Sequence, residues 1–468
     1  MSQQEIPKEI FEAHRQLSGC SAKFIEFVKD NPEASKRANF ESIVAHPIFN
    51  RYPQQPWPTF INEKTKNAME EACLQVFNLV KSIPGRVFDY DPHKIGRYYE
   101  IPVDKTRQLL EGVDDDYLGG LISRGDFIIS PAAGLKCIEY NMRASLGGWQ
   151  QDFMEDIYTS IPVIRRFIKE YSVKLRKSHF FLTLLEPIMD RAVERFGPNP
   201  KGEINTAIVF KEYLGDGQGF LNIRLKEMYK TALWKKDPGL KGDMFFCDFD
   251  KLQVVNNSII FRGKKIHVMI ERCFGEVPGW VLEVVKSGNL LLYNGPIVQI
   301  MANKFNIALL SELENSDLFS LEEKENIKKY IPWTRKLIPG ETTYGTKKIR
   351  LEDFVISHQE RLMVKSARGY GGYEVFDGAR IPAGQWKQQV EKALEERLWV
   401  VQEFIPPYSY LYQAGEHGCV PYQVVWGIFV FGSRYAGGFV RVLPEQNPSR
   451  VINLNQKAEQ SVALLVEE

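Results

Sequence analysis

The sequence predicts a mixed α+β and α/β protein with more than one domain. Its 468 residues exceed the roughly 250–300 residues at which single hydrophobic cores stop growing. From residue 205 to residue 312, short apolar strand patterns alternate with helical patterns, which is typical of an open α/β sheet. From residue 351 onward the pattern is a strand, a glycine-rich loop, a strand, a helix and several long strands.

The remaining segments set the expected domain boundaries. Residues 1–95 show helical spacing of apolar side chains, residues 96–150 show strand-like runs, and residues 151–197 are helical again. Residues 313–330 are charged and helical, which suits a boundary. We therefore expect four parts: a helical N-terminal region over 1–95, a hairpin segment over 96–175, an open α/β domain over 176–312, and C-terminal lobes over 313–468.

The composition argues against several classes of partner. Hydrophobic residues make up 44% and charged residues 25%, as in ordinary globular proteins, and the formal net charge is +1. Such a charge gives no basic field for nucleic acid. No apolar run approaches the roughly 20 residues that cross a bilayer, and the polar start is unlike a signal peptide. Six scattered cysteines are typical of reduced thiols, so we expect a cytoplasmic protein without nucleic-acid or membrane partners.

Residues 124–141 predict a hairpin that gathers polar side chains on one face. Two apolar runs flank residues 131–134, whose sequence Pro-Ala-Ala-Gly is typical of a turn. With a four-residue loop, the numbers of paired residues sum to 265. Because side chains repeat every two residues, this register puts four polar residues on one face in two facing pairs: Asp126 with Glu139, and Arg124 with Asn141.

Two facing carboxylates indicate a site for a hard divalent cation. They repel each other, and Mg²⁺ would remove the repulsion and take the oxygen of Asn141 as a further ligand. Arg124 beside them suits a phosphate bound with the metal. On this interpretation, a neutral replacement of either carboxylate does not harm the fold. The alternative is a hairpin with a merely solvated polar face, and a three-residue loop or a bulge would break the register.

A strand lysine followed by a glycine-rich loop predicts a phosphate-binding flap. Lys365 lies near the end of an alternating strand, and the loop contains Arg368, Gly369, Gly371 and Gly372. Glycine lets backbone N–H groups approach phosphate oxygens closely, and the lysine adds a positive charge. An ordinary hairpin turn is the alternative interpretation.

Three further segments suit a nucleotide site. The apolar strand that ends before Pro406 can offer backbone groups to an adenine edge, although a buried core strand has the same pattern. Its candidate residues are Gln402, Glu403, Phe404 and Ile405. Lys304 begins an apolar helical face, and Arg441 follows a double glycine on a strand. For both Lys304 and Arg441, the alternative interpretation is an ordinary surface charge in contact with water.

Taken together, these motifs resemble the circularly permuted ATP-grasp ligases, the family that includes the synthetase half of glutathionylspermidine synthetase. The family's motifs are matched here in order. Its R-x-D strand, E-x-N strand and N-K helix are matched by Arg124–Asp126, Glu139–Asn141 and Asn303-Lys304. Its strand lysine with a glycine-rich loop, its Q-E hinge and its late arginine are matched by Lys365–Gly372, Gln402-Glu403 and Arg441. Metal ligands ahead of both lysines reverse the ordinary ATP-grasp order. Ser366 departs from the family's usual proline, and residues 142–149 depart from its D-T-P-type run. No amidase half is evident, so glutathione and spermidine are not carried over as substrates.

The resemblance implies a circularly permuted ATP-grasp fold with an open α/β pre-ATP-grasp-like domain, a helical N-terminal region, and ATP and Mg²⁺ as cofactors. It implies that Asp126, Glu139 and Asn141 hold the metal and that Lys304, Lys365 and the 368–372 loop bind the phosphates. Adenine would lie against residues 402–405. Arg124 and Arg441 are the catalytic candidates that stabilise transferred charge. Arg143 is the candidate that binds the acid substrate, with a surface ion pair as the alternative.

The expected function is an ATP- and Mg²⁺-dependent carboxylate–amine ligase. It forms a peptide-like amide bond through an acyl phosphate and releases ADP, and its partners are a small-molecule acid and an amine. A homodimer stays open as its assembly state. Two alternatives remain: an ATP-grasp enzyme that activates a vinylogous acid for amino-acid attachment in a natural-product pathway, and a nucleotide-binding protein without catalysis.

Overall fold

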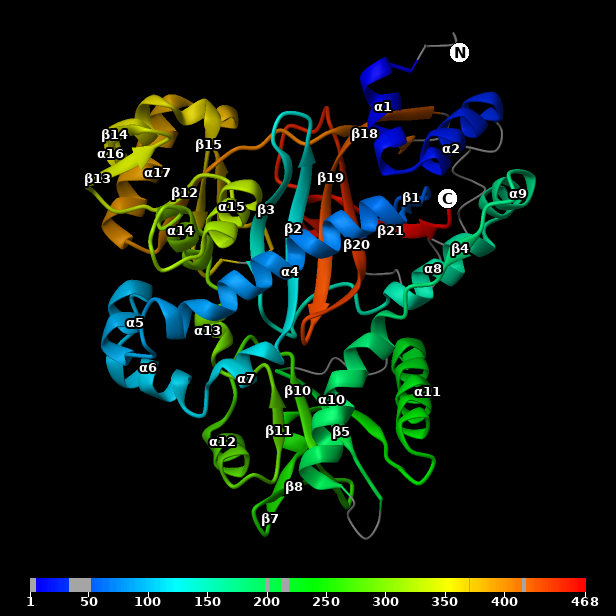
Figure 1. The fold of residues 1–468 in the computed structure, drawn as a ribbon, viewed down its shortest axis with the longest axis vertical. Helices are drawn as coiled ribbons and strands as arrows, with labels where there is room; N and C mark the ends of the chain where they lie inside the picture. The colour runs from blue at the N-terminus through cyan, green and yellow to red at the C-terminus, as the bar shows by residue number, and fades with distance from the viewer. Residues whose placement is uncertain (1–5, 33–51, 198–201, 212–218, 370, 415–417) are drawn as a thin grey trace.

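The computed structural model describes residues 6–32, 52–197, 202–211, 219–369, 371–414 and 418–468 (Figure 1). The expected mixed α/β class is confirmed, because helices accompany several separate sheets. Within the described residues there are sheets of eight, four, four, three and two strands. No helix in these ranges is long and apolar enough to cross a membrane. The six cysteines are all free.

The eight-stranded sheet joins segments that are far apart in the sequence and contains the polar hairpin (Figure 1). Its order is β1-β21-β20-β19-β2-β3, with β18 paired to β19 and β4 paired to β21. The strands are β1 (Thr59–Asn62), β2 (Ile122–Ser130), β3 (Gly134–Asn141), β4 (Leu175–Arg176), β18 (Ser409–Ala414), β19 (Gly418–Phe431), β20 (Arg434–Pro444) and β21 (Glu459–Val466). A turn at Gly432-Ser433 joins β19 to β20, since Phe431 pairs with Arg434.

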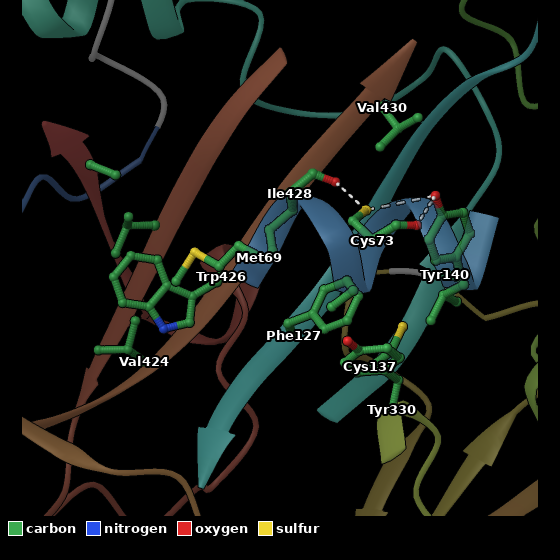
Figure 2. Packing of buried hydrophobic residues seen from close by; sticks show 14 of the residues in the cluster. Met69, Cys73, Phe127, Cys137, Tyr140, Tyr330, Val424, Trp426, Ile428 and Val430 are labelled. Atoms are coloured by element: carbon green, nitrogen blue, oxygen red, sulfur yellow. Dashed lines mark hydrogen bonds between the residues drawn. The ribbon is translucent and has the colours of Figure 1, made fainter. Parts of the chain in front are cut away.

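Helix α4 (Glu63–Arg86) packs across one face of this sheet (Figures 1 and 2). Sγ of Cys73 lies 3.4 Å from the carbonyl oxygen of Ile428, and Figure 2 shows Tyr140 on the same side. Gly125 makes this approach possible, since a Cβ there would lie 2.4 Å from the ring of Phe127 and 3.2 Å from Sγ of Cys73. Phe127 of β2 and Cys137 and Tyr140 of β3 therefore face α4, which leaves the alternate positions for the opposite face.

The turn of the β2–β3 hairpin differs from the expected one. Ser130 pairs with Gly134, so the loop has three residues and not four. Gly134 takes a φ of 65°, the left-handed conformation that commonly ends a three-residue hairpin loop. The uniform register expected from the sequence is therefore wrong at this end of the hairpin.

A β-bulge in β3 compensates for the shorter turn. Phe127 pairs with Cys137, whereas the preceding residue, Asp126, pairs with Glu139, so Ile138 is the extra residue. Beyond the bulge the expected register returns, and both facing pairs are confirmed: Asp126 with Glu139, and Arg124 with Asn141. A bulge lets two successive side chains point to one side, and Ile138 and Glu139 both face away from α4.

The N-terminal half is mainly helical, and the strand-like pattern expected from residue 96 is wrong until β2 begins. Asp91 accepts hydrogen bonds from the N–H groups of His93 and Lys94, and Asp114 accepts one from Tyr117. These N-caps favour helices where the apolar pattern is short. The helices are α1 (Lys8–Leu17), α2 (Gly19–Asp30), α5 (Pro92–Tyr99), α6 (Val103–Leu110), α7 (Asp115–Gly119), α8 (Gln151–Ser160), α9 (Pro162–Glu170) and α10 (Phe180–Phe196).

The alternating segment forms a sheet with helices, as expected, and its strands are parallel. Its order is β6-β5-β10-β11, from β5 (Thr206–Phe210), β6 (Met244–Asp248), β10 (Val268–Glu271) and β11 (Leu291–Tyr293). The chain passes from β5 to β6 on one side and later enters β10 on the other side of β5. This reversal is a topological switch point, where open α/β sheets leave a crevice at the carboxyl ends of their strands. Helices α11 (Gly219–Lys236) and α12 (Gly279–Lys286), and the small sheet of β7 (Gln253–Val255), β8 (Ser258–Phe261) and β9 (Lys264–Ile266), complete this part.

The C-terminal part contains a second four-stranded sheet of order β12-β17-β15-β16. The expected order of strand, glycine loop, strand and helix is confirmed, although residues 351–357 are helical. Its elements are β12 (Thr334–Lys336), β13 (Glu341–Tyr344), β14 (Lys347–Arg350), α16 (Leu351–Ser357), β15 (Leu362–Ser366), β16 (Val375–Asp377), α17 (Ala383–Glu396) and β17 (Trp399–Glu403), preceded by α13 (Val298–Met301), α14 (Phe305–Glu312) and α15 (Leu321–Tyr330). The boundaries between the four expected parts stay a prediction.

Candidate functional site

One cleft collects side chains from the large sheet and from the small C-terminal sheet. Its lining comes from β2, β3, β19 and β20 on one side and from β15, β16 and β17 on the other. Including its open mouth, it encloses about 890 Å³. Twelve of the sixteen predicted site residues line it: Asp126, Glu139, Lys304, Lys365, Gly369, Gly371, Gly372, Gln402, Glu403, Phe404, Ile405 and Arg441.

Asp126 is held by two arginines at the inner end of the cleft. Arg124 binds it with both ends of its guanidinium, at 2.7 Å from Nε to Oδ1 and 3.0 Å from Nη2 to Oδ2. Nη2 of Arg441 lies 2.8 Å from Oδ1, and all three side chains are buried. Burial raises the pKa of Asp126, but the two arginines outweigh it and hold the pKa below its usual value. Asp126 is therefore an ion-paired carboxylate in this structure.

Arg441 keeps unused donors in this cluster. Its contact with Asp126 has the distance of an ion pair but not the direction of a hydrogen bond, so Nε and Nη2 have no hydrogen-bond partner among the described residues. The residue is 4% exposed. Buried donors without partners are costly, and an anion in the cleft would satisfy them.

Glu139 and Lys304 form the second charged pair, 3.2 Å apart from Oε1 to Nζ. Lys304 precedes α14, as the sequence predicted, and its Nζ also donates to the carbonyl oxygen of Gly369 at 2.6 Å. The lysine thus joins the hairpin to the glycine loop. Burial raises the pKa of Glu139, and nearby cations, Lys304 first, bring it below the usual value.

Lys365 is buried, and none of the described carboxylates forms an ion pair with it. Its Nζ donates to Oε1 of Gln402 at 2.5 Å and to the carbonyl oxygen of Ile138 at 3.4 Å. Burial lowers its pKa to about 8, helped by Lys304 and opposed by Glu139. Lys365 is therefore a buried cation whose hydrogen bonds, within the described residues, go to neutral oxygens.

The glycine loop lies against the segment that follows β20. Gly371 and Gly372 have φ values of 71° and 75°, which only glycine adopts easily. A Cβ on Gly372 would lie 3.1 Å from the side chains of both Asn453 and Val451. Tyr370, within the predicted flap, is outside the described residues.

Arg368 does not reach the cleft. Its Nη2 donates to the carbonyl oxygens of Tyr99 and Glu100, each at 2.9 Å, at the C-terminal end of α5. These hydrogen bonds connect the start of the glycine loop to the N-terminal helices. The side chain of Arg368 therefore positions the loop in this structure.

The strand expected to bind adenine has already used most of its donors. The N–H groups of Glu403 and Phe404 donate to the carbonyl oxygens of Trp333 and Arg361. Within the described residues, the N–H of Ile405 makes no hydrogen bond, and two prolines follow it. Ile405 belongs to an apolar cluster with Ile128, Val425, Leu443, Ile452 and Ala458, which Ile138 joins. This end of the cleft is apolar with one unused donor.

Asn141 and Arg143 lie behind the cleft and do not line it. Asn141 is 1% exposed, and its Oδ1 accepts a hydrogen bond from Nη2 of Arg143 at 2.9 Å. The guanidinium of Arg143 packs over the ring of Phe274, 5.4 Å from its centre. Arg143 thus connects the hairpin to the loop after β10.

The predicted metal ligands suit Mg²⁺ by their chemistry. Within the described residues, no group of three or more His, Cys, Asp and Glu side chains gathers around one point. The set is two carboxylates and one amide, and Mg²⁺ is usually held by one or two carboxylates together with phosphate oxygens and water. Each of these three side chains now contacts a cation: Asp126 contacts Arg124 and Arg441, Glu139 contacts Lys304, and Asn141 contacts Arg143.

Sequence reasoning missed Arg450. Its guanidinium carbon lies 3.7 Å from the centre of the Phe404 ring, and its Nε donates to Asp377 on β16 at 2.6 Å. It lines the apolar end of the cleft. Arg450 lies in a loop without periodicity, so no sequence pattern identifies it.

No family model matches the chain, and a search of the curated proteins finds no similar sequence. The function is therefore inferred from the chemistry of the cleft. Its inner end holds four cations against two carboxylates, namely Arg124, Lys304, Lys365 and Arg441 against Asp126 and Glu139. Such an end suits a ligand with several negative charges.

Proposed function

We propose that the protein is an ATP- and Mg²⁺-dependent carboxylate–amine ligase that forms an amide bond through an acyl phosphate. The main support is the distribution of charge along the cleft. One end has an excess of buried cations, and the other is apolar and keeps the unused N–H of Ile405. A nucleoside triphosphate has matching parts, since its phosphates are anionic and its base is flat and accepts hydrogen bonds at its edge.

The order of the motifs adds a second, independent support. Segments resembling those of circularly permuted ATP-grasp ligases contribute side chains to one cleft, although they lie up to about 300 residues apart. A set of chance matches would have no reason to converge. The permuted ATP-grasp fold is therefore part of this proposal.

The residues of the cleft divide the work by position. Lys365, Lys304 and Arg441 bind phosphate oxygens, and the glycine loop offers backbone N–H groups. The unused N–H of Ile405 donates to the base, and Ile138 and Phe404 supply apolar contact. Because phosphoryl transfer depends mainly on positioning and charge stabilisation, buried cations around the γ-phosphate are what the reaction requires.

Asp126, Glu139 and Asn141 would hold Mg²⁺. The metal, when bound, neutralises phosphate charge and orients the γ-phosphoryl group. The cations that now pair with these residues then have phosphates as partners, so the site keeps its charges compensated with and without nucleotide. Arg124 stabilises the charge of the transferred group. Arg143 binds the carboxylate of the acid substrate.

The test is calorimetric titration with ATP in the presence of Mg²⁺. Lys365→Ala is expected to lose about 1.5–3 kcal/mol of binding free energy, the range for hydrogen bonds to charged groups, or roughly 10- to 150-fold in Kd. Lys347→Ala, which removes an exposed lysine on β14, is the matched control and keeps the parental affinity. Equal affinity of both variants contradicts the proposed phosphate site.

Catalysis is tested by screening acid and amine pairs for ADP release. The expected nucleotide product is ADP with phosphate, separated by ion exchange. AMP as the stoichiometric product contradicts the acyl-phosphate route. Tight ATP binding without turnover for any pair supports the alternative of a non-catalytic nucleotide-binding protein.

A further inference from the structure

Glu271 lies at the switch point of the parallel sheet. It is the last residue of β10. The strand order of the sheet reverses between β10 and its neighbour β5. Ligands of open α/β sheets bind at the carboxyl ends of the strands at this point. The proposed function has so far used no residue from this sheet.

The carboxylate of Glu271 is fully buried and only half satisfied. Oε2 accepts hydrogen bonds from the N–H groups of Cys273 at 2.8 Å and Gly275 at 3.2 Å. Oε1 is buried and has no hydrogen-bond partner within the described residues, and no ion pair of Glu271 occurs there. A buried carboxylate with an unused oxygen is costly unless a cation or a proton reaches it.

A short loop connects Glu271 to the cleft. Residues 142–150 run from the end of β3 to α8, and Arg143 lies near enough to Glu139 and to Glu271 to act on the charge of both. Nη2 of Arg272, the residue after Glu271, donates to the carbonyl oxygen of Leu146 at 2.9 Å. The loop over residues 142–150 therefore lies between the switch point of the parallel sheet and the hairpin that lines the cleft.

We propose that Glu271 binds the ammonium group of the amine substrate through Oε1 and accepts its proton. This inference rests on the proposed ligase function and assigns the amine to the carboxyl end of β10 in the parallel sheet. Arg143 holds the acid beside it, so the two substrates meet at one loop. The amine is then a primary amine that reaches the site as a cation.

The step balances as follows. One proton of the ammonium group passes to Oε1, which leaves a lone pair on nitrogen. That pair forms the C–N bond to the acyl carbon, while the C–O bond to the phosphoryl group breaks and its electrons leave with phosphate. Phosphate takes the second nitrogen proton, and Glu271 later returns its proton to water.

The electrostatics of Glu271 suit this task. Burial raises its pKa to about 7, while the N–H groups of Cys273 and Gly275 and the charges of Arg143 and Arg272 act in the opposite direction. The other titratable groups that face it are Tyr117 and the thiol of Cys273. A general base is most effective when its pKa lies near the working pH.

Glu155 supplies a matched control. Burial also raises its pKa, to about 8, but both of its oxygens are bound by Ser178. Glu155→Gln therefore removes a buried carboxylate whose two oxygens both have hydrogen-bond donors already. Its comparison with Glu271→Gln separates ammonium binding from the general effect of removing a buried charge.

Ammonium binding is tested with ethylammonium chloride as the probe. Ethylammonium is expected to raise the melting temperature of the wild type and of Glu155→Gln more than equal concentrations of tetramethylammonium chloride, which has no N–H to donate. Glu271→Gln is expected to show no such difference. A wild type that does not distinguish the two salts, or a Glu271→Gln variant that still does, overturns the proposal.

A measurement on the wild type keeps the proposal decidable if Glu271→Gln does not fold. In the wild type, the ethylammonium effect is expected to fall as the pH drops through about 7, because a protonated Glu271 does not attract a cation. An effect unchanged down to pH 5 contradicts the assignment.

Turnover distinguishes this inference from the proposed function. With an acid found in the ADP screen, Glu271→Gln is expected to make amide roughly 100-fold more slowly, the lower range for loss of a general base. It should still form hydroxamate with hydroxylamine, which is largely unprotonated at neutral pH. Equal loss with both nucleophiles overturns the role of base. A wild type without ATP turnover overturns the ligase function and the proton transfer, while the melting temperatures still decide ammonium binding.

Discussion

Nη2 of Arg441 lies 2.8 Å from Oδ1 of Asp126, although their strands, β20 and β2, are not neighbours. The strand between them is β19, and Asp126 pairs there with Gly427. A Cβ on Gly427 would lie 2.8 Å from Cδ of Arg124. The missing side chain therefore leaves room over β19 for Arg124, and three strands hold one buried group of charges.

Asp126→Asn is expected to destabilise the unliganded protein by about 3–5 kcal/mol, because it leaves two buried arginines without a countercharge. This reverses the expectation from the sequence, in which Asp126 and Glu139 only repelled each other. Glu139→Gln is the comparison, and it is expected to cost less, because Glu139 is 26% exposed. Urea unfolding of both variants measures the difference. Equal costs contradict the role of the two arginines.

The cost of Asp126→Asn should also depend on pH. The pKa of Asp126 is lowered in the folded protein, so its contribution is present above the unfolded pKa, about 3.9, and is lost as the pH falls through the lower folded value. The difference between wild type and variant is therefore expected to stay constant from pH 5 to pH 8 and to shrink only below about pH 4.

Lys365→Met is expected to stabilise the unliganded protein at pH 7 by about 2–3 kcal/mol while it weakens ATP binding. The folded pKa of about 8 lies below the unfolded value of about 10.4, so the buried charge costs stability at all pH values below 8. The gain is expected to shrink as the pH rises from 8 towards 10.4, where both states lose the proton. Urea unfolding at pH 7 and pH 9.5 measures this trend. A gain that does not change with pH means that the charge of Lys365 is not the cause.

Gly372→Ala is expected to cost about 1–2 kcal/mol of stability, because the left-handed conformation disfavours a side chain. Its Cβ would also press on Asn453 and Val451, so the loop should move and ATP affinity should fall about tenfold. Gly384→Ala is the control, since nothing lies within 4 Å of its Cβ in the first turn of α17. It is expected to stabilise the helix by about 0.5–1 kcal/mol and to leave the affinity unchanged. Equal ATP affinity of the two variants argues against a loop that contacts the nucleotide.

Deletion of Ile138 is expected to remove the bulge and to leave Glu139 opposite Asp126. Cys137 would still face α4, and Glu139, now next in the strand, would still face the cleft. The apolar wall beside Ile405 loses one side chain, so affinity for ATP should fall while the requirement for Mg²⁺ remains. Calorimetry at several Mg²⁺ concentrations measures both. A deletion variant that folds but no longer responds to Mg²⁺ contradicts this account of the hairpin.

The facing pairs of the hairpin could be predicted from residue spacing, but partly because two errors cancelled. The shorter turn shifts the register by one residue, and the bulge at Ile138 shifts it back before Asp126. The spacing gives the number of residues between two side chains. It does not show where in the strand an extra residue forms a bulge. The pairing of Asp126 with Glu139 was predictable, whereas the position of Ile138 was not.

Other features depend on contacts that no local pattern contains. The pairing of Asp126 with Arg441 requires β19 to lie between β2 and β20, and the sequence does not state the order of strands. The use of Arg368 as an anchor depends on the C-terminal end of α5, about 270 residues earlier. Glu271 had no distinguishing neighbours in the sequence, because its unused oxygen becomes visible only when the parallel sheet is formed.

The large sheet also affects the synthesis of the protein. Strand β2 ends at Ser130, and its partner β19 begins only at Gly418. At about 5–20 residues per second, roughly 15–60 seconds pass on the ribosome before the two can pair. During that time one edge of β2 has no partner, and Asp126 and Arg124 lack the strand that buries them. The nascent N-terminal half is therefore open to wrong strand pairing at this edge until β19 has been synthesised.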